Sequence, residues 1–288
     1  MHFGILVILA SCSFYTGLLI GLTSTESVPP LPANRKVDEW IKKLCSENKD
    51  PVCHHVIVLF KRKVSFCSAA KVASTTTYRY FFDISDGEVV IPKNARYGAH
   101  EANWTRLGSL DHKSRQNLLS SPSWTRVVFL RNVVERFISG YLDKVVNDCR
   151  RFNDTQIANS HLATSFYYQY GFSCEKHRNL ESFLSFMETV PRMEGHFSPQ
   201  SPLCNIQKFP HTDIIMADEN LDTNLQHLSK RLNVYHPQAD NKTSSHAQGA
   251  KTKMRDIFRG RRDLVDRILK LFDEDCISYP KACIVEEF

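Results

Sequence analysis

The chain has 288 residues, of which 42% are hydrophobic and 24% are charged, an ordinary balance for a globular protein. This composition excludes a mainly disordered or collagen-like chain. A formal net charge of +6 is compatible with an anionic ligand but is too small to indicate nucleic acid, and we expect no nucleic-acid partner. Nine cysteines favour an oxidising compartment.

Residues 3–22, FGILVILASCSFYTGLLIGL, form an uncharged apolar run. A helix of about 20 residues spans roughly 30 Å, the thickness of the hydrocarbon core of a bilayer. Signal peptides have a shorter apolar stretch, about 7–15 residues, behind a basic segment, and only Met1 and His2 precede this run. We expect residues 1–22 to be a signal anchor; a signal cleaved near residues 23–27 is the alternative. Either way, the rest of the chain enters the secretory pathway.

The remaining chain divides into a stem and one folded domain. Residues 23–34, TSTESVPPLPAN, are polar and contain several prolines, which predicts a stem that we assign to residues 23–54. Residues 38–45, DEWIKKLC, predict a short amphipathic helix at the start of the folded part. Residues 55–288 are expected to form one luminal domain. Its cysteines suggest disulfides, and because no C-x2-C pair is present we expect no metal. Sequons at Asn103, Asn153 and Asn241 support a luminal glycoprotein only weakly.

The first candidate site follows a predicted strand at residues 55–60, HVIVLF, and a second apolar run at residues 64–66. The next segment, CSAAKVASTTTYRYFF, reads as a small-residue loop that enters a helix. Backbone N–H groups and the dipole at a helix start attract anions, and Lys71 adds a positive charge. Ser74, Thr75 and Thr76 add hydroxyl donors. The glycines of a Walker A loop are absent, so a helix start rich in Ser and Thr that binds nothing is the alternative.

The second candidate site follows residues 124–130, WTRVVFL, which predict a buried parallel strand ending at Arg131. Ligands of open α/β sheets bind at this carboxyl end of the strands. The following segment, NVVERFISGYLDKVV, predicts a helix, and Arg131 and Ser139 could reach one phosphate together. Alternatively, Arg131 forms a structural ion pair with Glu135 and Ser139 is a small packing residue.

Together these segments resemble the Golgi carbohydrate sulfotransferases, particularly the group that sulfates chondroitin, dermatan and related glycans. Residues 67–79 look like that family's 5′-phosphosulfate loop, and FLRNVVERFISGYLDK at 129–144 looks like its 3′-phosphate motif. HFSPQSPLC at 196–204 is similar to the family segment H-W-x-P-x-x-x-L-C, and DLVDRILKLFDEDCISY at 263–279 is similar to its closing helix. The order of the four segments is more specific than any one of them.

The resemblance implies an α/β fold in which a central parallel sheet carries a nucleotide site like that of P-loop kinases. It also implies that the protein is an enzyme with 3′-phosphoadenosine-5′-phosphosulfate (PAPS) as sulfuryl donor and a glycan, such as a glycosaminoglycan, as acceptor. Catalysis needs positioning and charge neutralisation, so no metal is required. The implied donor-binding residues are Lys71, Val72, Ala73, Ser74, Thr75, Thr76, Arg131 and Ser139.

The resemblance also suggests catalytic roles. Lys71 would neutralise the leaving phosphate, and a histidine would accept the proton of the acceptor hydroxyl. His100, between the two donor motifs, is the first choice, and His196 is the second; a surface role for His100 is the alternative. Arg131 is expected to face the nucleotide, whereas Arg136 is expected to brace its helix through an ion pair.

Departures from the family pattern include Ala70 in place of Pro and Phe197 in place of Trp. Residues 76–77 and 132–133 also differ from it. A catalytically inactive relative that binds a glycan or a nucleotide is therefore the alternative function; a secreted, disulfide-linked binding protein is a third reading. The resemblance places the protein in the Golgi membrane as a single-pass type II protein, with secretion after signal cleavage as the alternative.

Disulfides are expected between Cys276 and Cys283, around Pro280, and between Cys204 and either Cys149 or Cys174. Cys67 could equally remain a buried free thiol.

Overall fold

The computed structural model describes residues 40, 43–45, 50–160, 164–237 and 254–285. The expected anchor, most of the stem and the sequon at Asn241 lie outside these residues. Within the described ranges, no helix is long and apolar enough to cross a membrane.

The folded domain alternates short strands with helices. Its strands are β1 (Val56–Leu59), β2 (Val64–Ser68), β3 (Thr105–Arg106), β4 (Thr125–Leu130) and β5 (Asp213–Met216). The helices before β5 are α2 (Val52–His55), α3 (Ser74–Asp83), η1 (Gly98–Glu101), η2 (Leu107–Ser109), α4 (His112–Ser120), α5 (Val133–Tyr141), η3 (Leu142–Val146), α6 (Asn147–Arg151), α7 (Asp154–Ala158), α8 (Ser165–Tyr168), α9 (Cys174–His177), α10 (Leu180–Met187) and α11 (Gln200–Cys204). Those after it are α12 (Leu221–Leu232), α14 (Arg262–Leu271), α15 (Asp273–Ser278) and η4 (Pro280–Cys283).

The five strands form one sheet in the order β3-β1-β2-β4-β5. The neighbours β2, β4 and β5 run parallel, as expected for the strands that carry the candidate site. The prediction of a parallel sheet is wrong for the other edge, because β1 pairs antiparallel with both β2 and β3. Only residues 60–63 join β1 to β2, and so short a connection reverses the chain, whereas a parallel pair needs a longer crossover. The fold is therefore α/β with a mixed sheet.

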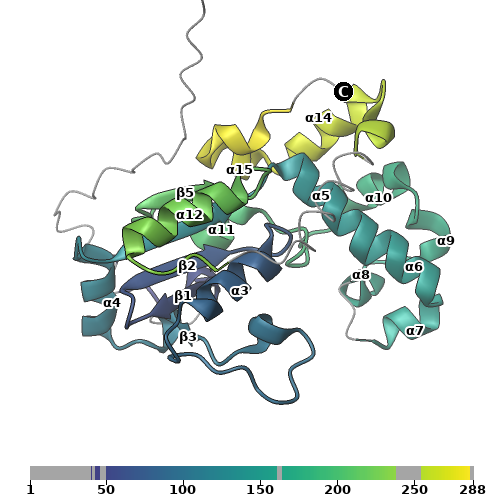
Figure 1. Cartoon of the computed structure of the whole chain (residues 1–288). Helices are drawn as coiled ribbons and strands as arrows, with labels where there is room; N and C mark the ends of the chain where they lie inside the picture. The colour runs from purple at the N-terminus through teal and green to yellow at the C-terminus, as the bar shows by residue number, and fades with distance from the viewer. Residues whose placement is uncertain (1–39, 41–42, 46–49, 161–163, 238–253, 286–288) are drawn as a thin grey trace, which may run out of the picture.

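Helices cover both faces of the sheet, so its inner strands are buried on both sides (Figure 1). Alternate residues of β4 divide between the two faces: Val127 and Phe129 pack on the side of α3 and α12. Val128 and Leu130 pack on the opposite side, against apolar residues of α2, α4 and α11. Strands buried on both faces explain the near-continuous apolar runs of the sequence.

A block of helices extends beyond the carboxyl end of β4, where Figure 1 shows α5 to α10 beside α14. Its core is rich in aromatic side chains, and Phe137 of α5 contacts the rings of Phe183, Phe197 and Phe272. Phe197, which replaces the family tryptophan, is fully buried and lies 3.1 Å from the position that a Cβ on Gly140 would occupy. Gly140 therefore allows residues 196–197 to approach α5 closely.

Four disulfides join the cysteines outside the apolar run. The expected pair of Cys276 with Cys283 is confirmed. The expected link from Cys204 to Cys149 or Cys174 is wrong, and so is a free thiol at Cys67, because Cys204 is bonded to Cys67. These two residues are far apart in the sequence but lie on neighbouring elements, β2 and α11, and both are fully buried. The remaining pairs are Cys149 with Cys174 and Cys45 with Cys53.

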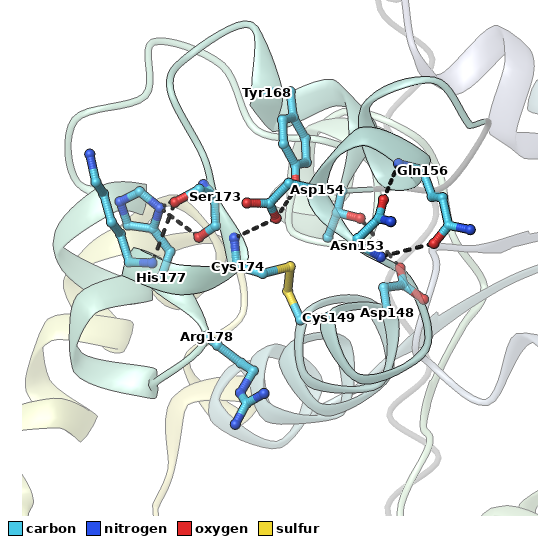
Figure 2. The surroundings of a disulfide bond; sticks show 12 residues. Asp148, Cys149, Asn153, Asp154, Gln156, Tyr168, Ser173, Cys174, His177 and Arg178 are labelled. Carbon is cyan, nitrogen blue, oxygen red and sulfur yellow. Dashed lines mark hydrogen bonds between the residues drawn. A yellow bond between two sulfur atoms is a disulfide. The ribbon is translucent and has the colours of Figure 1, made fainter.

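The bond between Cys149 and Cys174 ties the middle of α6 to the start of α9 (Figure 2). Asp154 strengthens this corner, since its carboxylate accepts hydrogen bonds from the Tyr168 hydroxyl at 2.7 Å and the Cys174 N–H at 3.0 Å. The expected sequon at Asn153 begins α7, where its side chain and that of Gln156 cap each other's backbone N–H groups. All of these contacts lie between residues 149 and 177, so the two cysteines are paired within one short stretch of the chain.

The folded part begins before residue 55. Leu44, Cys45, Val52 and Cys53 are buried in the core cluster beneath β1 and β4, although they were expected to lie in the stem. The disulfide between Cys45 and Cys53 holds this segment together.

Candidate functional site

The loop between β2 and α3 leads into a helix whose first N–H groups are available to bind a ligand. Helix α3 begins at Ser74, and no side chain caps this end. The first N–H groups of a helix have no acceptor within the helix, so here they can donate to an anion. Ser74 and Thr76 are half-buried and Thr75 is exposed. The predicted hydroxyl cluster therefore borders the helix start.

Two residues of this loop adopt a left-handed backbone conformation although neither is glycine. Lys71 has φ 66° and Ala73 has φ 54°, and the fully buried side chain of Val72 lies between them. A residue with a Cβ pays about 1–2 kcal/mol for this conformation. Successive N–H groups in such turns form concave anion-binding sites. The strained backbone at Lys71 and Ala73 therefore gives the loop a concave shape that suits a phosphate.

The carboxyl end of β4 brings Arg131 to the same loop. The Arg131 guanidinium donates from Nη1 to the Lys71 carbonyl at 3.2 Å and from Nε to the Glu135 carboxylate at 3.3 Å. The ion pair with Glu135 considered as the alternative is therefore present. Among the described residues, Arg131 Nη2 has no partner, so it remains able to donate to a ligand. Ser139, one further turn along α5, is half-buried.

The Lys71 ammonium forms an ion pair with Asp143 in η3, the π-helical turn that continues α5. Burial lowers the pKa of Lys71, and the positive charges of Lys144 and Arg131 lower it further, while Asp143 opposes the change. Lys144 contacts the same Asp143 oxygen at 3.1 Å. Residues 135, 139 and 143 are four apart, so the helix presents them along the side that faces the loop.

Arg136 holds the loop in place from beneath. Its side chain is fully buried and donates to the carbonyls of Ala70 at 2.9 Å, Ser198 at 2.7 Å and Gly195 at 3.2 Å. The expected ion pair is thus replaced by three backbone bonds, which join the loop to residues 195–198. Burial lowers the pKa of Arg136 to about 10, opposed chiefly by the charge of Asp275, so the guanidinium remains protonated at neutral pH.

Gln200 and Asp275 fix the backbone of Arg131. The Gln200 amide accepts from the Arg131 N–H at 2.9 Å and donates to the Arg131 carbonyl at 3.0 Å. The buried carboxylate of Asp275 in turn accepts from the N–H groups of Gln200 at 2.9 Å and Ser201 at 2.6 Å. Burial raises the pKa of Asp275, and these hydrogen bonds oppose the rise.

The two candidate histidines occupy different surroundings. His100, on η1, places Nε2 3.3 Å from the Thr75 hydroxyl, and its ring contacts that of Tyr78 at a tilt of 31°, with centroids 4.5 Å apart. Burial lowers the pKa of His100, which favours the neutral ring. His196 instead bonds both oxygens of Glu194 through Nδ1 at 2.9 Å. The structure therefore brings His100, and not His196, to the first turn of α3.

A sequence model of the sulfotransferase family matches residues 54–280, which include every candidate residue above. The chain belongs to the sulfotransferase family. No curated protein and no solved structure gives a significant match. The expected membership of a sulfotransferase family is therefore confirmed at the level of the family.

The structure gathers most of the predicted sulfotransferase site residues at the carboxyl ends of β2 and β4. Lys71 to Thr76 form one wall, and Arg131 and Ser139 belong to the other. Among the described residues, no group of three or more His, Cys, Asp or Glu side chains is placed to hold a metal ion.

Sequence reasoning missed three residues that contact the candidate site residues or support them: Asp143, Gln200 and Asp275. A spacing of four residues from Ser139 could have indicated Asp143. Gln200 and Asp275 leave no comparable sequence signal, because their roles depend on contacts between segments far apart in the chain.

Proposed function

We propose that this sulfotransferase moves the sulfuryl group of PAPS to a hydroxyl of a glycan. The observation that carries the proposal is the meeting of Lys71 and the open start of α3 with Arg131 at the edge of the parallel strands. One wall offers N–H groups and an ammonium, and the other offers a guanidinium. Such a pair of walls suits a nucleotide with a phosphate at each end.

In the proposed complex, the 5′-phosphosulfate lies against the N–H groups of residues 72–76 and the Lys71 ammonium. The 3′-phosphate lies against Arg131 and Ser139. Arg136, Gln200 and the disulfide of Cys67 support these groups without touching the donor, since they bond the loop and strand backbones. Such prior positioning reduces the reorganisation needed when charge develops.

The proposed transfer is an in-line displacement at sulfur. The acceptor oxygen forms a bond to sulfur while the bond from sulfur to the bridging phosphate oxygen breaks, and the bisphosphate leaves with that electron pair. Lys71 and the helix N–H groups neutralise the charge that grows on the leaving phosphate. His100 takes the proton of the acceptor hydroxyl, and a neutral ring close to the first turn of α3 suits that role.

A chondroitin-like glycosaminoglycan acceptor and a Golgi location complete the proposal. They rest on the sequence resemblance, on the apolar run at residues 3–22 as a type II anchor, and on the disulfides, which suit an oxidising lumen. Acceptor specificity depends on surface loops, which vary more than the core of a fold.

The test is transfer of radiolabelled sulfate from PAPS by the full chain to desulfated chondroitin, dermatan and heparan. Label on one of these chains, absent with Lys71→Met, supports the proposal. Binding of adenosine 3′,5′-bisphosphate without transfer to any glycan would instead indicate the catalytically inactive relative. An absence of both binding and transfer would remove the donor site.

A further inference from the structure

The ion pair between Lys71 and Asp143 occupies the ammonium that the proposed donor site requires. The Asp143 carboxylate is the counter-ion of this lysine. An ammonium of this kind cannot give its full attraction to a phosphate while a carboxylate remains bound to it. The two anions therefore compete for one cation.

Breaking the ion pair would cost Lys71 more than Asp143. The Lys71 side chain is only 19% exposed, whereas that of Asp143 is 43% exposed and has Lys144 as a second cation at 3.1 Å. If Asp143 leaves Lys71, its charge stays in contact with Lys144 and water. Lys71 without a counter-ion would instead leave a charge largely removed from water, which is costly.

The titration behaviour of Asp143 agrees with this geometry. Burial would raise the pKa of Asp143, but the hydrogen bonds and charges of Lys71 and Lys144 outweigh it, so that the pKa lies below its usual value. The carboxylate therefore stays ionised at neutral pH and competes as an anion.

We propose that Asp143 is the resident counter-ion of Lys71 and that the 5′-phosphate end of the donor must displace it. The inference rests on the proposed donor site. Asp143 keeps Lys71 charged and in place while the site is free of donor, and it lowers donor affinity by the strength of the pair that has to be broken. On displacement, Asp143 remains paired with Lys144.

The location of Asp143 suits such an exchange. It lies in η3, where the helix widens from α to π geometry after Tyr141. Single π-helical turns of this kind occur frequently at functional sites. A carboxylate at this point reaches residues 69–73, which we call the donor loop, from the same continuous helix that bears Ser139, so this helix carries both the counter-ion and part of the proposed 3′-phosphate site.

The experiment measures the affinity of the full chain for adenosine 3′,5′-bisphosphate by calorimetry at fixed salt. Asp143→Asn should bind about fivefold more tightly than wild type, because partly exposed ion pairs contribute up to about 1 kcal/mol. In a Lys71→Met background the same substitution should change the affinity by less than about twofold, since no ammonium remains to be released. Unchanged or weaker binding by Asp143→Asn would overturn the proposal.

A matched control separates this effect from a general change of charge. Asp263→Asn removes the same charge from the first turn of α14, where Asp263 forms an exposed pair with Arg261, and should leave the affinity within about twofold of wild type. An equal gain with both variants would contradict the counter-ion role. Adenosine 3′-monophosphate, which lacks the 5′-phosphate, should show no gain with Asp143→Asn, and a gain as large as with the bisphosphate would also contradict it. If wild type does not bind the bisphosphate at all, the proposed function fails rather than this step alone.

Discussion

The two sides of the candidate site are built differently. The loop at residues 69–73 is held from below by buried bonds: Arg136 donates to the Ala70 carbonyl, and the disulfide of Cys67 anchors the strand before it. The segment from Ile84 to Trp104, which carries His100, is the long blue loop below α3 in Figure 1. Several of its bonds are exposed, such as that from the Val90 N–H to Asn103 at 2.7 Å, although the Trp104 indole donates to the Ala99 carbonyl in a buried bond.

The exposed residues show the same contrast. Tyr97 is 72% exposed and Val90 is 59% exposed in the His100 segment, whereas Val72 in the donor loop is fully buried. Under the proposed function, the donor would bind on the side held by buried bonds and the acceptor on the side nearer the surface, because surface loops vary more than the core of a fold. The comparison predicts that changes beneath the donor loop affect folding, whereas changes in the His100 segment affect turnover.

The largest effect is expected for Arg136→Ala. The substitution leaves three carbonyls without their donor and removes the cation near Asp275, so the free energy of unfolding should fall by about 3–5 kcal/mol. Urea denaturation of the full chain measures this change. Arg131→Ala is the matched control and should cost less, about 1–2 kcal/mol, because it breaks one backbone bond and an ion pair that is not fully buried. Equal losses for both would contradict the supporting role of Arg136.

Arg131→Ala should mainly weaken donor binding. Loss of a charged phosphate contact costs about 2–5 kcal/mol, which corresponds to a fall in bisphosphate affinity of about thirtyfold or more. Calorimetric titration checks this value. The loss should exceed that caused by Arg136→Lys, which keeps a buried cation under the loop. An affinity for Arg131→Ala equal to that of wild type would remove Arg131 from the site.

His100→Ala should lower the rate of sulfate transfer at least about a hundredfold and leave bisphosphate binding nearly unchanged. Burial lowers the pKa of His100, so the ring stays neutral down to a pH below the usual pKa of histidine. The base is active when unprotonated, and the acid limb of the rate should therefore lie below about pH 6.5. His196→Ala is the comparison. If it abolishes transfer while His100→Ala does not, the base is His196.

The smallest effect concerns the strained loop. Ala73→Gly should raise the free energy of unfolding by up to about 1 kcal/mol, because glycine adopts a positive φ without cost from a Cβ. Ala70→Gly, whose φ is not positive, should instead lower it by about 0.4–1 kcal/mol through added freedom of the unfolded chain. Thermal unfolding of the two variants compares them directly. Stabilisation by both, or by Ala70→Gly alone, would contradict the assignment of strain to Ala73.

Local patterns predicted much of this fold. The apolar runs at residues 64–66 and 124–130 became β2 and β4, and the helix after Arg131 became α5 and η3. The direction of β1 was predicted wrongly, although the short connection at residues 60–63 already implied a hairpin. Strand β5 was not predicted, because DIIM is short and its sequence neighbours are polar.

Long-range contacts were harder to predict than elements. The pairing of Cys67 with Cys204 and the bonds of Gln200 to Arg131 join segments that local sequence cannot relate. The short loop between Cys276 and Cys283 could be predicted, since its ends cannot move far apart. The sequence indicated the donor-loop residues through their chemistry, whereas the supporting residues emerged only from the fold.

The central claim is that a nucleotide donor lies between the start of α3 and the end of β4. A crystal structure of the full chain with adenosine 3′,5′-bisphosphate tests it most directly. The account predicts the 5′-phosphate on the N–H groups of residues 72–76 with Lys71 turned toward it, and the 3′-phosphate on Arg131 and Ser139. A nucleotide bound elsewhere, for example in the hollow of about 450 Å³ lined by Arg62, Asp83 and Tyr235, would contradict it.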